Sequence, residues 1–174
     1  MYYFPTGGTR QYAYLNLTNQ FSTWSHNAPS STIISLSGSG DSNGNGRTNI
    51  GYAFHSVQGY SKIGTYTGNG SGDGPFIYTG FKPAFLMIKR MDSANNWWII
   101  DDKRDDYQNP FSDLLEANTS GAENANTPRG DFLSNGFKWR VSPNAFNASN
   151  GTYLYMAFAA NPFVTSDGVP TTAK

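Results

Sequence analysis

The amino-acid sequence predicts an all-β protein, an antiparallel β-sandwich or jelly roll with little or no helix. Short apolar runs recur along the chain of 174 residues, and clusters rich in Gly, Asn and Ser separate them. Aromatic residues make up 16% of the chain and charged residues only 14%, a balance that suits half-buried strands joined by tight turns. Only residues 110–124 show a helical spacing of apolar residues, and Asn118, Thr119 and Gly121 limit them to a short helix or an irregular loop.

The expected strands follow from local apolar patterns. Residues 84–90 (AFLMIKR) begin with an unbroken apolar run, which predicts a central strand covered on both faces. Residues 96–101 are similar, and the polar residues between these two strands (91–96, MDSANN) predict a hairpin turn. Residues 151–159 alternate with the period of two that is typical of a strand. The other expected strands span residues 12–17, 31–36, 49–56, 61–68, 75–80 and 137–142.

Charge and cysteine content exclude several classes of function. Lys and Arg number 12 and Asp and Glu number 12, and this formal net charge of zero argues against nucleic acid and a membrane surface as partners. The chain has no cysteine, which excludes disulfides and thiolate metal sites. No apolar run approaches the ~20 residues of a membrane-spanning helix, and the first residues (MYYFPTGGTR) lack the pattern of a signal peptide.

A sequence repeat links two distant parts of the chain. Residues 47–60 (RTNIGYAFHSVQGY) resemble residues 151–163 (GTYLYMAFAANPF), and the match extends upstream when Phe54 is aligned with Phe158. Self-similarity of this kind indicates a duplicated supersecondary unit. The matched residues are Asn43, Thr48, Ile50, Tyr52, Ala53 and Phe54 in the first copy, and Asn147, Thr152, Leu154, Met156, Ala157 and Phe158 in the second.

The two copies differ in what precedes them, because only the second follows a length of chain sufficient for four more strands. Residues 1–57 are therefore predicted to be a partial module, its C-terminal half, residues 58–163 a complete β-sandwich module, and residues 164–174 a flexible tail. A half module exposes apolar faces and open sheet edges. We expect it either to fold onto the second module as one sandwich, or to be completed by a neighbouring subunit or by missing upstream chain.

A family resemblance rests on three strings of sequence. They are YAFHSVQGYSKIGTYTGNGSGDGPFIYTGFKPAFLMIKR (52–90), DFLSNGFKWR (131–140) and NGTYLYMAFAANPF (150–163). Together they resemble a domain of tail-fibre and other virion proteins of marine bacteriophages, in which the pattern Y-x-F-H-S-V-x-G-Y-S-K-x-G-x-Y-T-G-N-G links one module to the next. The resemblance covers about residues 12–163. It implies a virion-associated β-sandwich protein with no established enzyme activity and no known catalytic residues.

The residues themselves give little support to catalysis or metal binding. The only glutamates are Glu116 and Glu123, and the two histidines are not spaced as metal ligands. Residues 41–46 (DSNGNG) begin like a calcium loop, but Tyr52 stands where the bidentate carboxylate belongs. The Gly-rich residues 59–74 lack the residue order of a phosphate-binding loop. We therefore predict no enzyme activity, no catalytic residues, no cofactor and no metal.

Aromatic residues are the remaining candidates for ligand binding, because sugars stack on Trp and Tyr rings while Asn, Asp and Ser side chains bind the hydroxyls. Trp97 and Trp98 are adjacent and point to opposite faces of a sheet, so one is expected in the core and the other on a second face, an interface or a sugar site. Tyr66 and Tyr78 are similar candidates, and Asp73 is a candidate for ligand or cation binding. For each aromatic residue the alternative is a place in the core or a subunit contact.

The expectation for function is a structural protein of a phage virion, assembled in the cytoplasm of a bacterial host and then extracellular. It would be a tail-fibre or appendage module that attaches to the host by non-covalent surface binding, with a host surface glycan as one option for the ligand. Its other partners would be other virion proteins and copies of itself in a homo-oligomer, for which a trimer is the first expectation. The alternative is an architectural head-decoration or fibre-coating subunit that binds only virion proteins, and a carbohydrate-active enzyme ranks last.

Overall fold

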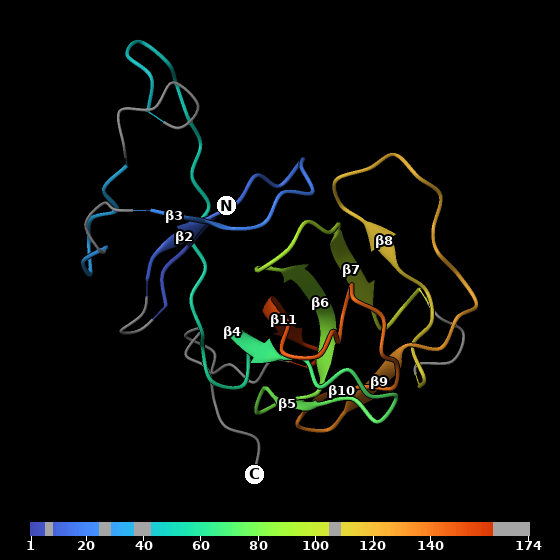
Figure 1. Ribbon diagram of the computed structural model, residues 1–174. Helices are drawn as coiled ribbons and strands as arrows, with labels where there is room; N and C mark the ends of the chain where they lie inside the picture. Colours follow the sequence, from blue (N-terminus) through green and yellow to red (C-terminus); the bar gives the residue numbers. More distant parts are fainter. Residues whose placement is uncertain (6–8, 25–28, 37–42, 105–108, 162–174) are drawn as a thin grey trace.

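The computed structural model (Figure 1) confirms the prediction of an all-β protein. It describes residues 1–5, 9–24, 29–36, 43–104 and 109–161. In these residues the chain forms eleven strands, arranged in three antiparallel sheets, and no helix. The described chain accordingly offers no helix with the length and apolarity needed to cross a membrane. The finer choice of a sandwich or a jelly roll stays a prediction.

The largest sheet has five strands in the order β4-β11-β6-β7-β8. Its middle strands are those that the sequence predicts from apolar patterns, and the hairpin that joins β6 to β7 is confirmed. β11 pairs with β4 along one side and with β6 along the other, so this last strand of the described chain is an internal one. The bounds are β4 (Ser61–Thr67), β6 (Pro83–Arg90), β7 (Trp97–Asp101), β8 (Leu115–Glu116) and β11 (Thr152–Ala159).

A second sheet, of three strands in the order β5-β10-β9, shares a hydrophobic core with the first. Its strands are β5 (Phe76–Tyr78), β9 (Gly130–Leu133) and β10 (Gly136–Trp139). Ile77, Phe137 and Trp139 from this sheet belong to the same buried cluster as Leu86 and Ile88 of β6. Within this sheet, β10 and β5 lie so close at Gly136 that an added Cβ would lie 2.1 Å from the carbonyl oxygen of Ile77. A strand at 130–133 was not among those expected from the sequence.

The opposite face of the five-stranded sheet is covered by residues 1–5 and 9–24, which we call the N-terminal arm. The arm carries a small sheet of three strands, β1 (Tyr2–Tyr3), β2 (Gln11–Tyr12) and β3 (Ser22–Thr23), in the order β1-β2-β3. Ala13 and Phe21 of the arm pack in a second buried cluster with Trp97 and Leu154. The five-stranded sheet is therefore buried on both faces, as the continuous apolar run of β6 predicts.

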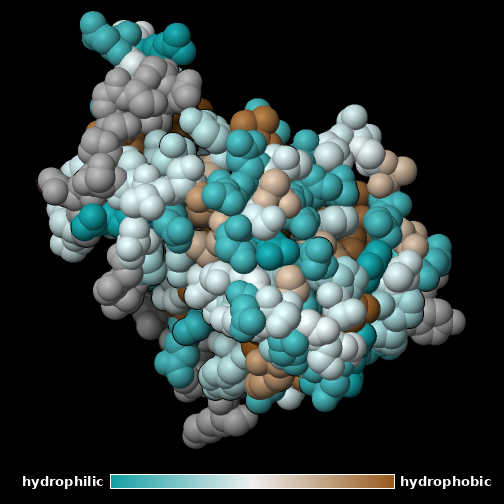
Figure 2. Space-filling model, viewed as in Figure 1, coloured by the Kyte–Doolittle hydropathy of each residue, from teal (hydrophilic) through white to brown (hydrophobic). Residues whose placement is uncertain are grey.

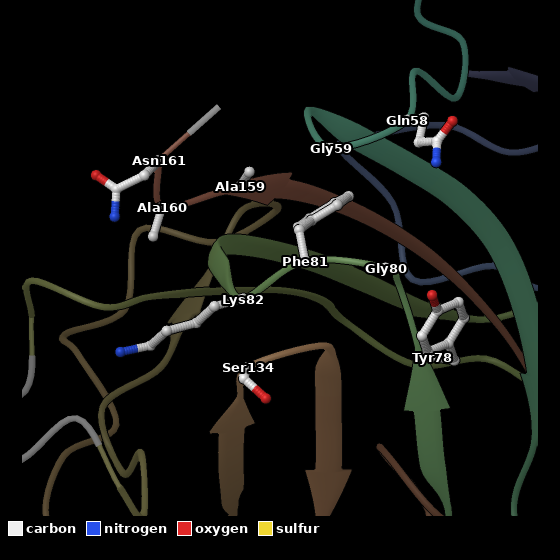
Figure 3. Close-up of a pocket in the computed structure, with 10 residues that line it drawn as sticks. All are labelled: Gln58, Gly59, Tyr78, Gly80, Phe81, Lys82, Ser134, Ala159, Ala160 and Asn161. Atoms are coloured by element: carbon white, nitrogen blue, oxygen red, sulfur yellow. The ribbon is translucent and has the colours of Figure 1, made fainter. Parts of the chain in front are cut away.

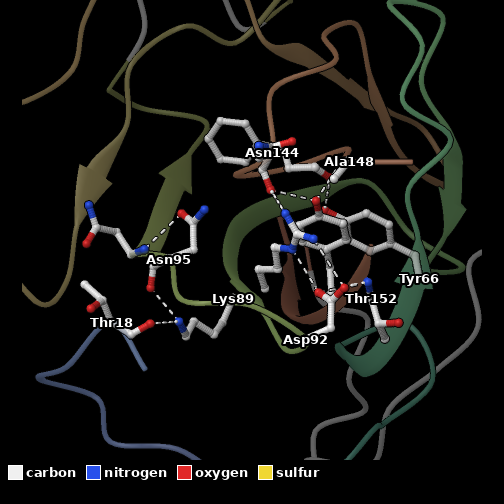
Figure 4. Close-up of polar contacts among 12 residues, drawn as sticks. Thr18, Tyr66, Lys89, Asp92, Asn95, Asn144, Ala148 and Thr152 are labelled. Carbon is white, nitrogen blue, oxygen red and sulfur yellow. Dashed lines mark hydrogen bonds and ion pairs between the residues drawn. The ribbon is translucent and has the colours of Figure 1, made fainter. Parts of the chain in front are cut away.

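Lys89 of β6 fastens the arm to the sheet (Figure 4). Its side chain is fully buried, and its Nζ donates hydrogen bonds to the carbonyl oxygens of Thr18, at 2.8 Å, and of Asn95. The backbone N–H of Asn95 also donates to Thr18, at 2.8 Å. Burial lowers the pKa of Lys89 from its ordinary value of 10.5 to about 8.

Three strand predictions in the first part of the chain are wrong. Residues 31–36 and 49–56 form no strand, and of the expected strand 12–17 only Tyr12 lies in one. An apolar pattern becomes a strand only when a neighbouring strand shares a ladder of backbone hydrogen bonds with it, and among the described residues no such ladder forms over 13–17, 31–36 or 49–56. The expected tail at 164–174 lies outside the described residues.

Candidate functional site

The three buried candidates of the sequence are parts of the core. Trp97 is 1% exposed and Trp98 8% exposed, on opposite faces of the sheet as their adjacency predicts. The indole N–H of Trp97 donates to the Tyr14 carbonyl at 3.0 Å. Tyr66 is stacked on Tyr153 with ring centroids 4.9 Å apart, its hydroxyl donates to the Phe146 carbonyl, and burial raises its pKa. These placements favour the core alternative for all three residues.

Asp73 and Tyr78 lie at the surface instead. The Asp73 carboxylate is well exposed and pairs with the Lys138 ammonium at 2.8 Å, and the hydrogen bond and charge of Lys138 lower the pKa of Asp73. Tyr78 is 64% exposed at the end of β5. Asp73 does not line the hollow that Tyr78 borders, so the structure does not gather the sequence candidates into one site.

Tyr78 borders a surface hollow of about 400 Å³ between the ends of the two sheets (Figure 3). Beside it, a second hollow of about 340 Å³ shares Gln58, Tyr78 and Gly80. Polar side chains from four separate segments reach the first hollow beside one exposed aromatic ring, a composition that suits a small polar ligand such as a sugar. Its lining residues are Gln58, Gly59, Tyr78, Gly80, Phe81, Lys82, Ser134, Ala159, Ala160 and Asn161.

The turn that follows Tyr78 gives the hollow a fixed rim. Gly80 has a φ of +87°, in the left-handed region that favours glycine. The backbone N–H groups of Thr79 and Gly80 both donate to the Asn135 carbonyl, at 3.0 and 3.1 Å, and the Thr79 hydroxyl donates to Phe81 at 2.6 Å. The sequence pointed to this site only through Tyr78 as an aromatic candidate, because the four segments that line the hollow lie far apart along the chain.

The most conspicuous surface feature is an extended run of exposed residues, 47–56, which we call the exposed segment. Every residue in it is exposed, and Ile50, Tyr52 and Phe54 are 80%, 82% and 57% exposed. Their spacing of two would place all three on one face of a strand. In Figure 1 the segment runs from the neighbourhood of the N-terminal arm down to β4. By contrast, the face shown in Figure 2 is mostly teal and white, with brown atoms in small separate groups.

Charged groups of the surface are largely engaged with one another. Arg104 pairs with Asp101 at 2.8 Å and with Glu123 at 2.7 Å, and Arg140 pairs with Asp131 at 2.6 Å. Among the residues that the structure describes, no group of three or more His, Cys, Asp or Glu side chains gathers where it could hold a metal ion. The arrangement therefore offers two kinds of chemistry, binding of a polar ligand beside Tyr78 and burial of apolar side chains against a partner.

These features define an all-β protein with two sheets around a shared core, an arm over the outer sheet face and an exposed apolar segment. The chain belongs to a family described as a domain of unknown function (DUF7483), whose model matches residues 7–162. No curated protein and no solved structure matches the chain.

Proposed function

We propose that the protein is a structural component of a phage virion, a tail-fibre or appendage module that assembles with other β-structured subunits and attaches to the host by non-covalent binding. The phage assignment is supported by the resemblance of residues 52–90, 131–140 and 150–163 to virion proteins of marine bacteriophages. The assembly assignment is supported by one observation above all, the exposure of Ile50, Tyr52 and Phe54.

The energetics of that exposure favour an assembled state. Burying one large apolar side chain stabilises a protein by about 1.5–3 kcal/mol relative to leaving it in water. Single apolar residues on a surface are ordinary, but three at alternate positions of a short extended segment supply a surface that a partner can cover. An assembly subunit gains from this arrangement, whereas an isolated enzyme or transport protein gains nothing from it.

Attachment to the host would use the hollow beside Tyr78. Its polar side chains and exposed ring suit weak contacts with a surface glycan, and several copies in one oligomer would raise the overall affinity through avidity. The alternative, an architectural subunit that binds only virion proteins, shares the assembly surface but needs no ligand in the hollow.

Light scattering tests the assembly part. We expect an oligomeric mass for the wild-type chain, and a monomer when Ile50, Tyr52 and Phe54 are all replaced by Ser. The matched control replaces Tyr60 and Phe76, two other exposed aromatic residues (41% and 44%), by Ser and should stay oligomeric. A wild-type chain that remains a monomer at high concentration contradicts the proposal.

Binding of the oligomer to a glycan array and to host cells tests the attachment part. We expect binding that Tyr78→Ala weakens at least tenfold and that Phe76→Ala leaves unchanged, because Phe76 lies on the same strand but does not line the hollow. Absence of any binding by an oligomer that forms normally would favour the architectural alternative.

A further inference from the structure

We infer that the exposed segment binds the free edge of β4 in a second copy of this chain and adds a strand to that copy's five-stranded sheet. The inference rests on the assembly part of the proposed function and adds to it a partner, a contact surface and a kind of bonding, the backbone ladder of a β-sheet.

The sequence of the exposed segment is that of a strand which pairs with β4. Its residues 48–54 match residues 152–158, which lie in β11. β11 pairs with β4 along this whole length, so that Thr152 lies opposite Thr67 and Phe158 opposite Ser61. The fold therefore shows which partner a strand of this type accepts. In the first copy the same type of sequence is exposed, without a ladder among the described residues.

β4 has an open edge that can accept such a strand. It pairs with β11 on one side only, and its odd-numbered residues direct their backbone groups to the other side, as Ser61 and Ile63 show. Thr65 and Thr67 have the same orientation and are exposed. Within the described chain no strand lies beside them on that side, so their backbone N–H and C=O groups are available for a new ladder.

A ladder on this edge already begins within the chain and then stops. Val57 and Ser61 exchange two backbone hydrogen bonds of 2.9 Å. One step further, the Ser56 hydroxyl takes the place of a partner backbone, accepting from the Ile63 N–H at 3.0 Å and donating to the Ile63 carbonyl at 3.3 Å. The chain then leaves the edge, and the Phe54 ring lies 6.0 Å from that of Phe158. The edge beyond Ile63 is thus left for another chain.

The other edge of the sheet is a poor alternative. β8 has only two residues, and the chain beside it folds back on itself through the bridge between Leu114 and Asn124. β4 has seven residues, and residues 64–67 lie beyond the contacts of Val57 and Ser56. Charge also permits the contact, because each element carries a single residue of the types Lys, Arg, Asp and Glu. This residue is Arg47 in the exposed segment and Lys62 in β4. Sheet edges with unpaired backbone groups and few charges are those that pair with other chains.

Disulfide trapping tests the inference directly, because the wild-type chain has no cysteine. One protein carries Thr67→Cys, and three others each carry one cysteine in the exposed segment, at Asn49→Cys, Gly51→Cys or Ala53→Cys. All four positions are exposed, and an added Cβ at Gly51 meets no atom within 4 Å. The Thr67→Cys protein is mixed with each segment variant and oxidised slowly, and covalent heterodimers are identified by mass. Ser120→Cys, in the exposed loop after β8, replaces Thr67→Cys in the control mixtures.

We expect at least one segment variant to form heterodimers with Thr67→Cys at five times or more the yield that it gives with Ser120→Cys. Equal yields in a chain that light scattering finds oligomeric would overturn the inference and leave the assembly proposal standing. A monomeric chain would overturn both. A double variant with Gly51→Cys and Thr67→Cys tests whether the segment pairs with β4 of its own chain. If its two cysteines form a disulfide within one chain at high protein concentration, the assignment to a second copy is wrong.

Discussion

The two copies of the sequence repeat lie in opposite environments, the second buried and the first exposed. In the second copy Leu154 is 2% exposed and lies in a strand that is paired on both sides. Its counterpart Ile50 is 80% exposed and lies in no strand. The two segments have the same alternating pattern, so local sequence cannot explain the difference. What differs is the presence of neighbours, since β4, β6 and the N-terminal arm surround the second copy.

The asparagines at the start of each copy show the same contrast. Asn147 is fully buried. Its side-chain amide N–H groups donate to the side-chain oxygen of Asn69 at 2.9 Å and to the backbone carbonyls of Ser71 and Val141 at 2.8 and 3.0 Å. Its side-chain oxygen accepts from the backbone N–H of Asn69 at 2.7 Å. Asn43 is exposed. The repeated pattern thus forms a buried strand in one place and an exposed segment without strand pairing in the other, and the surrounding chain decides which.

Truncation at the paired positions Leu154 and Ile50 should give the largest difference. Leu154→Ala removes methyl groups from a closed cluster and should lower the free energy of unfolding by about 3 kcal/mol. Ile50→Ala should change it by less than about 0.5 kcal/mol in dilute solution, because that side chain is already in water. Urea unfolding of the two variants at low protein concentration measures both values. Equal losses would mean that the exposed segment is packed after all.

The matched asparagines should give a smaller difference. Asn147→Ala leaves the Asn69 N–H and the Ser71 and Val141 carbonyls without their buried partner, which should cost about 2 kcal/mol. Asn43→Ala is the control and should have no measurable effect in dilute solution. Thermal unfolding of both variants and of the wild type measures these changes in stability. If Asn147→Ala leaves the stability unchanged, water replaces the lost hydrogen bonds.

The pH dependence of stability tests the attachment of the arm over the second copy, and here we expect the smallest effect. Because the pKa of Lys89 falls to about 8 in the folded protein, the unfolded chain binds more protons than the folded one between about pH 8 and 10.5. Stability should therefore rise by about 1 kcal/mol from pH 8 to 9.5, below the range in which the raised pKa values of the buried tyrosines reverse the trend.

Lys89→Met is the control for this pH effect, since Met has no proton to lose. The difference in unfolding free energy between wild type and Lys89→Met, measured in urea at pH 7.5, 8.5 and 9.5, should move in favour of wild type as the pH rises. A constant difference would mean that the ammonium is better solvated than its burial indicates.

Sequence patterns were reliable wherever the strand and its partner lie close along the chain or the apolar run is long. The runs at 84–90 and 96–101 form β6 and β7, and the polar residues between them form the expected hairpin. The alternating run at 151–159 forms β11. The continuous apolar runs of β6 and β7 are buried in almost any compact arrangement of the chain, so local pattern predicts them well.

Candidate site residues were less predictable, because exposure is a property of the whole fold. One of Trp97 and Trp98 was expected in the core and the other on a second face, an interface or a sugar site, and only the structure shows that the N-terminal arm buries the second face, which Trp97 occupies. The hollow beside Tyr78 combines Gln58, Lys82 and Asn161 from distant segments. No spacing within the sequence brings these residues together.

By itself the sequence determined the class of the fold, four strands of the five-stranded sheet (β4, β6, β7 and β11) and the existence of a repeated apolar pattern. Those features follow from side-chain alternation and turn residues, which act over a few neighbouring positions. Only the tertiary structure decided which copy of the repeat is buried, that the arm closes the outer sheet face and that Tyr78 borders a hollow. A strand completes its hydrogen bonds with residues far away along the chain, so its environment is fixed only when those residues meet.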